Sequence, residues 1–469
     1  MSNTYTKTAC TATALAVLLL ALPAQAIDLA REIAHNGFNP ERTSISVADV
    51  GNGKEMAEHL PDLKLNPASC AKIVTSASAL AVLGPDHRFR THFYADRAPQ
   101  SGTIGTLYVA GTGDPLLINE ELAQIASHLA RKGIKRISEG VVIDNSYFDS
   151  YEYPRKQTGD GRAYTAKTAA TAVNFNSVAV VVGPGARAGA PGTVKLDPPG
   201  DHYKVVNKVV TGGKFRAAIS LSEKGGLPVV TVTGRVPPRF APQKLYRSVS
   251  NPALHAAAVV ASWLEQAGVQ VGPSLGEGKA PDGAVGLLTW ESRPLSDVVA
   301  DMNKVSNNFI AEQTLKHLGA VKYGAPGSTA KGVSAAEDYL ASIGVPKGSY
   351  RFENGSGLSE HTRISSRQLV AVLVAAYRDA RIRNAFVESL SLMGVDGTTK
   401  KWRFAPELSG RIHVKTGTLD GVSTLAGYAP TAEGRVAAFA ILANGLPRGA
   451  WPAKEAQMGV VRAITENMR

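Results

Sequence analysis

The spacing of hydrophobic and polar residues is typical of helices near the two ends of the chain and of strands in its middle. The apolar run 77–82 predicts a helix that begins near Pro67, because proline has no N–H to lose and its φ suits a first helical turn. From Pro294 onward the helical rhythm returns, and it predicts helices at 295–303, 308–318, 334–343 and 366–377.

Strand-like runs fill the middle of the chain. They alternate with turns rich in Gly and Pro, and amphipathic helices are predicted among them at 120–132 and 251–267. We interpret residues 93–283 as an inserted β-rich region of one or two subdomains, with two favoured. Its predicted strands are 105–110, 140–144, 178–182, 217–221 and 228–233.

The two ends of the chain also contain strand patterns, and these predict an antiparallel sheet. Residues 42–50 alternate in polarity and run into the turn Gly51-Asn52-Gly53. A helix predicted at 453–468 has an apolar face that suits the surface of a sheet. Just before it come three more strand candidates, at 411–418, 423–429 and 435–444, the first of which we expect at an edge of the sheet.

The predicted fold class is therefore α+β, with an antiparallel sheet and a helical region. Residues 27–92 and 284–469 are expected to form one domain, which the inserted region 93–283 splits. A short helix is also expected at 27–35.

Residues 1–26 have the pattern of a secretory signal. Lys7 is their only charge, 11–22 is apolar, and Ala24-Gln25-Ala26 is a cleavage site of the A-x-A kind. The apolar run is too short for a membrane span, and no comparable run follows. We therefore expect cleavage after Ala26 and a mature chain in the periplasm without a transmembrane span; the other interpretation is an uncleaved anchor.

The charged residues, cysteines and histidines of the chain indicate which partners and cofactors to expect. The net charge is +12, but lysines and arginines are scattered without aromatic interleaving, which argues against nucleic acid and favours an anionic matrix. Loss of Cys10 with the signal leaves Cys70 alone, so no intrachain disulfide is possible, and a small buried residue is its expected role. The histidines are not at ligand spacing, and we expect neither a metal nor a cofactor.

Ser69 and Lys72 form the first chemical motif, S-x-x-K. Three residues apart on a helix, they share a face, and a lysine of lowered pKa can take the proton of a serine nucleophile. The motif alone is weak, because Ser328 and Lys331 also match it, in a loop-like context that we interpret as a turn leading into a helix.

Two further motifs follow. Ser306-Asn307-Asn308 is an S-x-N triplet, for which a helix-capping loop is the plain structural interpretation. Lys415-Thr416-Gly417 is a K-T-G triplet that occurs once in the chain and is followed by Thr418.

The order S-x-x-K, S-x-N, K-T-G resembles that of the penicillin-binding proteins and serine β-lactamases. The 237 positions from Ser69 to Ser306 resemble the long insertion of class C low-molecular-mass penicillin-binding proteins, which are D-alanyl-D-alanine carboxypeptidases and endopeptidases. Further stretches that look like this family are Gly113-Asp114-Pro115, Val142-Ile143-Asp144, Val173-Asn174-Phe175-Asn176, Gly355-Ser356-Gly357-Leu358-Ser359 and Gly394-Val395-Asp396-Gly397-Thr398.

The resemblance implies a transpeptidase-like domain and a role for each motif residue. Ser69 would be the nucleophile, Lys72 the general base, and Ser306 a proton relay. Substrate would be bound by Asn308, Lys415, Thr416, Gly417 and Thr418, and the backbone N–H groups of Ser69 and Thr418 would form the oxyanion hole. The implied partners are peptidoglycan stem peptides that end in D-Ala-D-Ala, cross-linked muropeptides and β-lactam antibiotics.

Two other functions compete with this one. A β-lactamase of class A would need an E-x-x-L-N element between the last two motifs, and none is found. A wall-binding protein with a dead site would not need the catalytic side chains, all of which are present.

Overall fold

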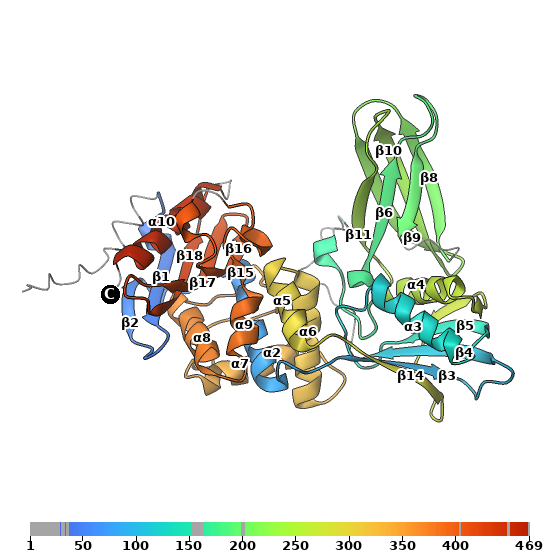
Figure 1. The fold of residues 1–469 in the computed structure, drawn as a ribbon, viewed down its shortest axis with the longest axis horizontal. Coiled ribbons are helices and arrows are strands. Elements are labelled where there is room, and N and C mark those ends of the chain that lie inside the picture. The colour runs from blue at the N-terminus through green and yellow to red at the C-terminus, as the bar shows by residue number, and fades with distance from the viewer. Residues whose placement is uncertain are drawn as a thin grey trace, which may run out of the picture.

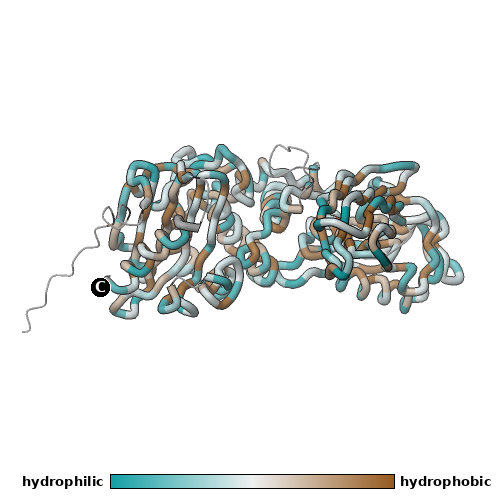
Figure 2. Tube along the Cα trace, turned by 90° about the horizontal axis from the view of Figure 1, so that it is seen from above, coloured by the Kyte–Doolittle hydropathy of each residue, from teal (hydrophilic) through white to brown (hydrophobic). Residues whose placement is uncertain are grey.

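The computed structural model describes residues 29, 33, 37–149, 151, 161, 163–197, 202–402, 405–447 and 451–467. Figure 1 shows two bodies side by side: a sheet with helices around it, and a second body of strands with a projecting lobe. Seen from above in Figure 2, the chain narrows between them. The predicted signal at 1–26 and most of the helix predicted at 27–35 lie outside the described residues.

The first body is built on an antiparallel sheet in which the two ends of the chain meet. Strand β1 pairs with β18 from Thr43↔Ala443 to Asp49↔Ala437. The strand order is β15 (Ser391–Leu392), β16 (His413–Leu419), β17 (Val422–Pro430), β18 (Val436–Asn444), β1 (Thr43–Asp49) and β2 (Glu55–His59).

The two faces of this sheet pack against different helices and form two separate hydrophobic cores. Along β18, Phe439 and Ile441 face α10 (Trp451–Asn467), whose Val460 and Ile464 are fully buried against them. The alternate positions Val436, Ala438, Ala440 and Leu442 face the helices on the other side, as the period of two along a strand requires.

The helical layer contains α2 and the helices that follow the insertion. Ser328 caps the N-terminus of α7 by accepting from Lys331 N at 3.0 Å, so the second S-x-x-K match is the helix-leading turn that we expected. The helices are α2 (Ala71–Leu83), α5 (Leu295–Lys304), α6 (Asn308–Tyr323), α7 (Thr329–Ser342), α8 (Ser366–Arg378) and α9 (Arg383–Ser389).

The second body has its own mixed sheet and two packed helices. The helices α3 (Asn119–Arg131) and α4 (Pro252–Gln266) pack on the sheet with a shared apolar core. The strands are β3 (Arg90–Ala95), β4 (Thr103–Gly111), β5 (Arg136–Asp144), β12 (Gln270–Val271), β13 (Ser274–Glu277) and β14 (Val285–Glu291).

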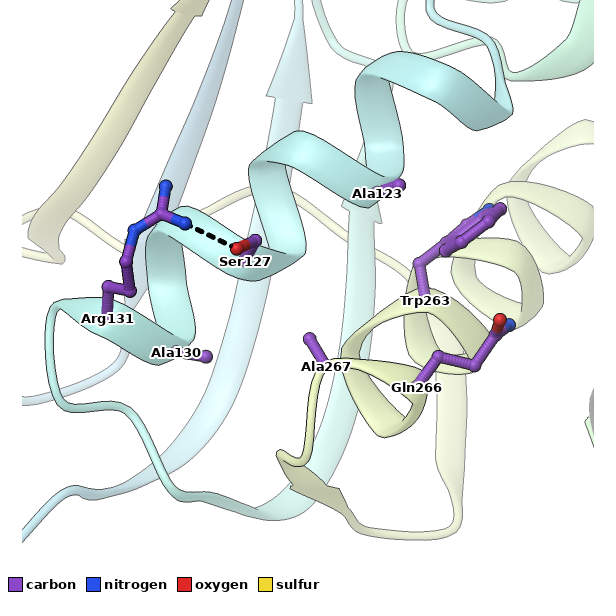
Figure 3. A pocket seen from close by; sticks show the side chains of 7 residues that line it. All are labelled: Ala123, Ser127, Ala130, Arg131, Trp263, Gln266 and Ala267. Carbon is purple, nitrogen blue, oxygen red and sulfur yellow. Dashed lines mark hydrogen bonds between the residues drawn. The ribbon is translucent and has the colours of Figure 1, made fainter.

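An open groove of about 610 Å³ runs between α3 and α4. Figure 3 shows Trp263 at its α4 side and the bond from Arg131 to Ser127 on α3. The Trp263 indole N–H donates to Asn119 Oδ1 at 3.2 Å, which ties α4 to the start of α3.

Two small sheets form the lobe that projects in Figure 1. Their buried valines share one core. One sheet has the order β8 (Lys204–Thr211), β10 (Leu227–Val236), β9 (Arg216–Lys224), and the other has the order β11 (Gln243–Ser248), β6 (Ser177–Gly183), β7 (Thr193–Asp197).

The predicted α+β class, with an antiparallel sheet and β-rich extra regions, is confirmed. The expectation that K-T-G lies on an edge strand is wrong in one respect. A two-residue strand, β15, pairs with His413 and Val414, so β16 is second in the sheet. That pairing stops before Lys415, because β15 is too short to extend along the motif.

Candidate active site

Ser69 lies in a short 3₁₀ turn, Ala68–Cys70, directly before α2. The turn is pinned to the sheet from both sides. Thr424 Oγ1 donates to Pro67 O at 2.7 Å, and Asn444 Nδ2 donates to Asn66 O at 3.1 Å. Ser69 itself is half-buried, so its hydroxyl is accessible at the N-terminus of a helix, where backbone N–H groups are free to meet an anion.

Lys72 is one helical turn further on, and its amine lies 3.0 Å from Ser69 Oγ. It donates to Asn308 Oδ1 at 2.8 Å and to Ser356 O at 2.7 Å. A neutral amine has two N–H donors and one lone pair. The two acceptors use both donors, and the lone pair is left for the hydroxyl proton of Ser69.

Burial lowers the pKa of Lys72 well below its ordinary value, and the nearby cation Lys415 lowers it further. The side chain is fully buried, so water does not stabilise its charged form. Burial also lowers the pKa of Lys415, to about 8.

Ser306 lies in the loop between α5 and α6 with φ = +58°, an uncommon conformation for a residue with a side chain. Lys415 Nζ donates to Ser306 Oγ at 2.8 Å and to Thr416 O at 2.8 Å. Asn307 caps α6 by accepting from Ile310 N, and Asn308 is the first helical residue. The S-x-N triplet thus caps a helix and also brings its outer residues to the two lysines.

Strand β16 approaches the Ser69 turn so closely that only glycine fits at position 417. A Cβ there would lie 2.9 Å from Ser69 N and 2.8 Å from Pro67 O. Thr416 Oγ1 lies 2.9 Å from Thr398 Oγ1, and Thr418 is exposed two residues further along the strand. Cys70 is fully buried behind this contact, with Sγ 3.2 Å from Lys415 O, as expected of a small packed residue.

Sequence reasoning missed the support behind Lys72. Glu312, one turn after Asn308 on α6, is buried and accepts from Gly355 N at 3.0 Å and Ser356 N at 2.9 Å. These bonds fix the loop whose carbonyl oxygen, on Ser356, binds the amine of Lys72. The spacing of four residues from Asn308 was a signal that could have indicated Glu312. Thr398 and Ser356 were noted only within family-like stretches.

Gly357 in the same loop offers a test of this packing. Its φ is +78°, and a Cβ would lie 1.9 Å from Ala68 O, beside the nucleophile. Gly84 at the end of α2 has φ = +86° with open space around it. We expect Gly84→Ala to lower the free energy of unfolding by about 1–2 kcal/mol, because alanine is strained at this positive φ. We expect Gly357→Ala to lower the free energy of unfolding by about 1–3 kcal/mol more than Gly84→Ala does, and to slow acylation of Ser69 at least tenfold.

The measurements are urea unfolding and the rate of acylation by a β-lactam. Equal stability losses in the two glycine variants, with acylation unchanged in Gly357→Ala, would contradict the close contact between the two loops.

A cavity of about 530 Å³ continues from Ser306 and Asn308 towards the second body. Its walls include Tyr164, Phe175 and Phe309 as well as residues of β11 and α3. Within the described residues, no group of His, Cys, Asp or Glu side chains is arranged to hold a metal ion. The structure brings Ser69, Lys72, Ser306, Asn308 and Lys415 together in an arrangement that suits acyl transfer through a serine nucleophile.

Comparisons with known proteins agree with this chemistry. Residues 25–465 match the model of the D-Ala-D-Ala carboxypeptidase 3 (S13) family. A D-alanyl-D-alanine carboxypeptidase from Actinomadura sp. (strain R39) is 32% identical over 424 residues, which cover 86% of this chain and 78% of that protein.

Solved structures share the fold. Penicillin binding protein 4 (dacB) from Haemophilus influenzae matches with a TM-score of 0.78 and 23% identity, over 94% of this chain and all of that one. A predatory endopeptidase from Bdellovibrio bacteriovorus matches with a TM-score of 0.55 and 16% identity, over 91% of this chain and 93% of that one. The family match and the 32% identity show that the chain belongs to the D-Ala-D-Ala carboxypeptidase 3 (S13) family, and its activity is that of a serine D-alanyl-D-alanine carboxypeptidase.

Proposed function

We propose that Ser69 attacks the carbonyl carbon between two terminal D-alanines of a peptidoglycan stem peptide. The Ser69 Oγ–carbon bond forms and the carbon–nitrogen bond breaks, which leaves an acyl-enzyme and a free amine. Lys72 accepts the serine proton, and Ser306 passes a proton to the leaving amine. Water then hydrolyses the ester and frees Ser69.

The observation that carries this proposal is the hydrogen bonding of Lys72. A buried amine that donates to Asn308 Oδ1 and Ser356 O, beside the Ser69 hydroxyl, is set up as a base and not as a cation.

We assign substrate binding to the strand and loop around the nucleophile. Lys415, Thr416 and Thr418 bind the terminal carboxylate, and Gly417 lets the substrate lie against β16. The N–H groups of Ser69 and Thr418 stabilise the oxyanion. Asn308 holds the substrate amide on the acyl side of the scissile bond.

Stem peptides that end in D-Ala-D-Ala, cross-linked muropeptides and β-lactams are the proposed ligands. A cross-linked muropeptide differs only in the amine that leaves, so the same site can act as an endopeptidase. The endopeptidase from B. bacteriovorus that shares the fold supports this extra activity. β-Lactams acylate Ser69 and are released slowly.

We further propose that residues 1–26 direct export to the periplasm and are removed after Ala26. Among the described helices, none is long and apolar enough to cross a bilayer. We also propose the division into a catalytic domain of 27–92 and 284–469 and an insertion of 93–283. The pairing of β3 with β14 where the chain enters and leaves the second body supports the split, and it extends the insertion to residues 90–291.

Analysis of the cleavage products tests both the activity and the preference between carboxypeptidase and endopeptidase substrates. The enzyme is given a stem pentapeptide and a cross-linked muropeptide, and the products are separated by chromatography. We expect D-alanine from the first, cleaved monomers from the second, and neither from Ser69→Ala. Unchanged activity in Ser69→Ala would overturn the proposal, and rapid penicillin turnover would favour a β-lactamase.

A pH profile tests the charge of Lys415. Its pKa of about 8 means that the cation is present below that pH and lost above it. We therefore expect kcat/KM for a D-Ala-D-Ala peptide to fall as pH rises past about 8, because the substrate carboxylate loses its partner. In Lys415→Arg the charge persists, and this alkaline decline should disappear. A decline at the same pH in both proteins would assign it to another group.

A further inference from the structure

The lobe that the two small sheets form (Figure 1) has most of the net charge of the protein. Residues 177–248, which contain both sheets, include 11 lysines and arginines but only 3 acidic residues, a net charge of +8. The whole chain has a net charge of +12, so the other 397 residues together contribute only +4. The lobe is therefore the electropositive part of the molecule.

One face of the β8-β10-β9 sheet has basic side chains and no acidic ones, and we call it the basic face. Ile219, Val230 and Val232 pack in the core between the two sheets of the lobe, so the alternate residues of each strand form the opposite, outer face. Glu223, the acidic residue of these strands, is on the core side. The strand registers place five exposed basic residues on the outer face: Lys204, Lys208, Arg216, Lys224 and Arg235.

The cations of the basic face are spread in two dimensions. They come from three neighbouring strands, which span about 10 Å across the sheet, and Arg216 and Lys224 lie about 27 Å apart along β9. Small or apolar side chains lie between them, among which Val210 and Ala218 are exposed. A single polyanionic strand is bound by cations that follow a groove, whereas a broad basic face suits a flat array of anions.

The other sheet of the lobe faces the candidate active site. Asp197, Lys244 and Tyr246, from β7 and β11, line the cavity that continues from Ser306. They lie on the outer face of their sheet, because Leu245 between them packs in the shared core. Two sheets that pack face to face have outer faces that point in opposite directions. The basic face therefore points away from the cavity, and a surface bound there leaves the active site open.

We propose that the basic face docks the enzyme on a bilayer that contains anionic phospholipids. The five cations pair with lipid phosphates, and Val210 and Ala218 contact the lipid between them. Each lysine or arginine close to such a surface strengthens binding about fivefold. Salt screens this attraction, so docking is reversible and weakens as ionic strength rises. Docking does not depend on the roles proposed for the active-site residues.

Sedimentation with vesicles tests the proposal. The mature protein should bind vesicles of phosphatidylcholine with about one-third phosphatidylglycerol at low salt, and should bind neither these vesicles at high salt nor phosphatidylcholine alone. The triple variant Lys204→Gln, Lys208→Gln, Lys224→Gln should bind the anionic vesicles about 10²-fold more weakly, because three contributions of about fivefold are lost. Arginine in place of the same three lysines keeps the charges and should retain binding. Both triple variants should release D-alanine from a soluble peptide within twofold of the wild-type rate.

The matched control is Lys54→Gln, Lys135→Gln, Lys279→Gln, which removes three exposed charges outside the lobe. It should bind the anionic vesicles within threefold of the wild type. Equal losses in the two glutamine variants would show that only the net charge matters, and would overturn the basic face as the docking surface. Absence of vesicle binding by the wild type would also overturn it. If the three lobe lysines supported binding to insoluble peptidoglycan but not to vesicles, the face would belong to a cell-wall polymer, and membrane docking would be wrong.

Discussion

Replacing Lys72 with arginine is expected to lower the rate of Ser69 acylation about 10²–10⁴-fold, the range that a general base contributes. Arginine keeps the positive charge but does not lose its proton in proteins, so it has no lone pair for the serine proton. It is also larger than the fully buried site that holds the Lys72 amine between Asn308 and Ser356. The measurement is the second-order rate constant for acylation by a β-lactam.

Lys331 provides the matched control, because it is the lysine of the second S-x-x-K match. Its amine donates to the carbonyl oxygens of Gly324 and Pro326 in an exposed turn. Lys331→Arg should leave acylation within twofold of the wild type. Near-normal acylation by Lys72→Arg would show that some other group takes the serine proton.

Replacing Glu312 with alanine is expected to lower the free energy of unfolding by about 2–6 kcal/mol. Its carboxyl is the acceptor for the buried N–H groups of Gly355 and Ser356, and each unsatisfied N–H costs about 1–3 kcal/mol. The loop would also release the Ser356 carbonyl from Lys72, so acylation should slow as well.

Urea unfolding measures the loss, and Glu388→Ala is the control. Glu388 is exposed on α9, and its removal should change stability by no more than about 0.5 kcal/mol. If Glu312→Ala were as stable as Glu388→Ala, the loop 355–357 would not depend on this carboxyl.

The main elements of the fold could be predicted because their hydrophobic periods are clear. The helices α2, α5, α6 and α8 and the strands β4, β6 and β10 lie where the pattern predicted them. Strand β8 was missed, because its alternation is broken: Lys204, Val205, Asn207 and Lys208 are all exposed. The short strand β15 is set by pairing with β16 and has no pattern of its own.

The order of the motifs predicted which residues meet at the candidate site. The residues that hold them in place could not be predicted from the sequence. Ser356 acts through its carbonyl oxygen, which every residue type has. Gly357 is required by the Ala68 carbonyl, far from it in sequence. Contacts of these kinds depend on backbone paths and not on side-chain patterns.

The clustering of charged side chains on the surface is also not evident from the sequence. Lysines and arginines are scattered along the sequence, yet five of those in the described strands lie on one face of the β8-β10-β9 sheet. The registers of β8 and β9 with β10 place Lys204, Lys208, Arg216, Lys224 and Arg235 on that face. Strand pairing therefore concentrates charge that sequence spacing hides.

The central claim is that Ser69 forms the acyl-enzyme, and mass spectrometry tests it most directly. The mature protein is incubated with benzylpenicillin, its intact mass is measured, and the adduct is located by peptide mapping. We predict one adduct per chain on the peptide that contains Ser69, and none on Ser69→Ala. An adduct that persists on Ser69→Ala, or a wild type that is neither acylated nor able to hydrolyse penicillin, would contradict the account.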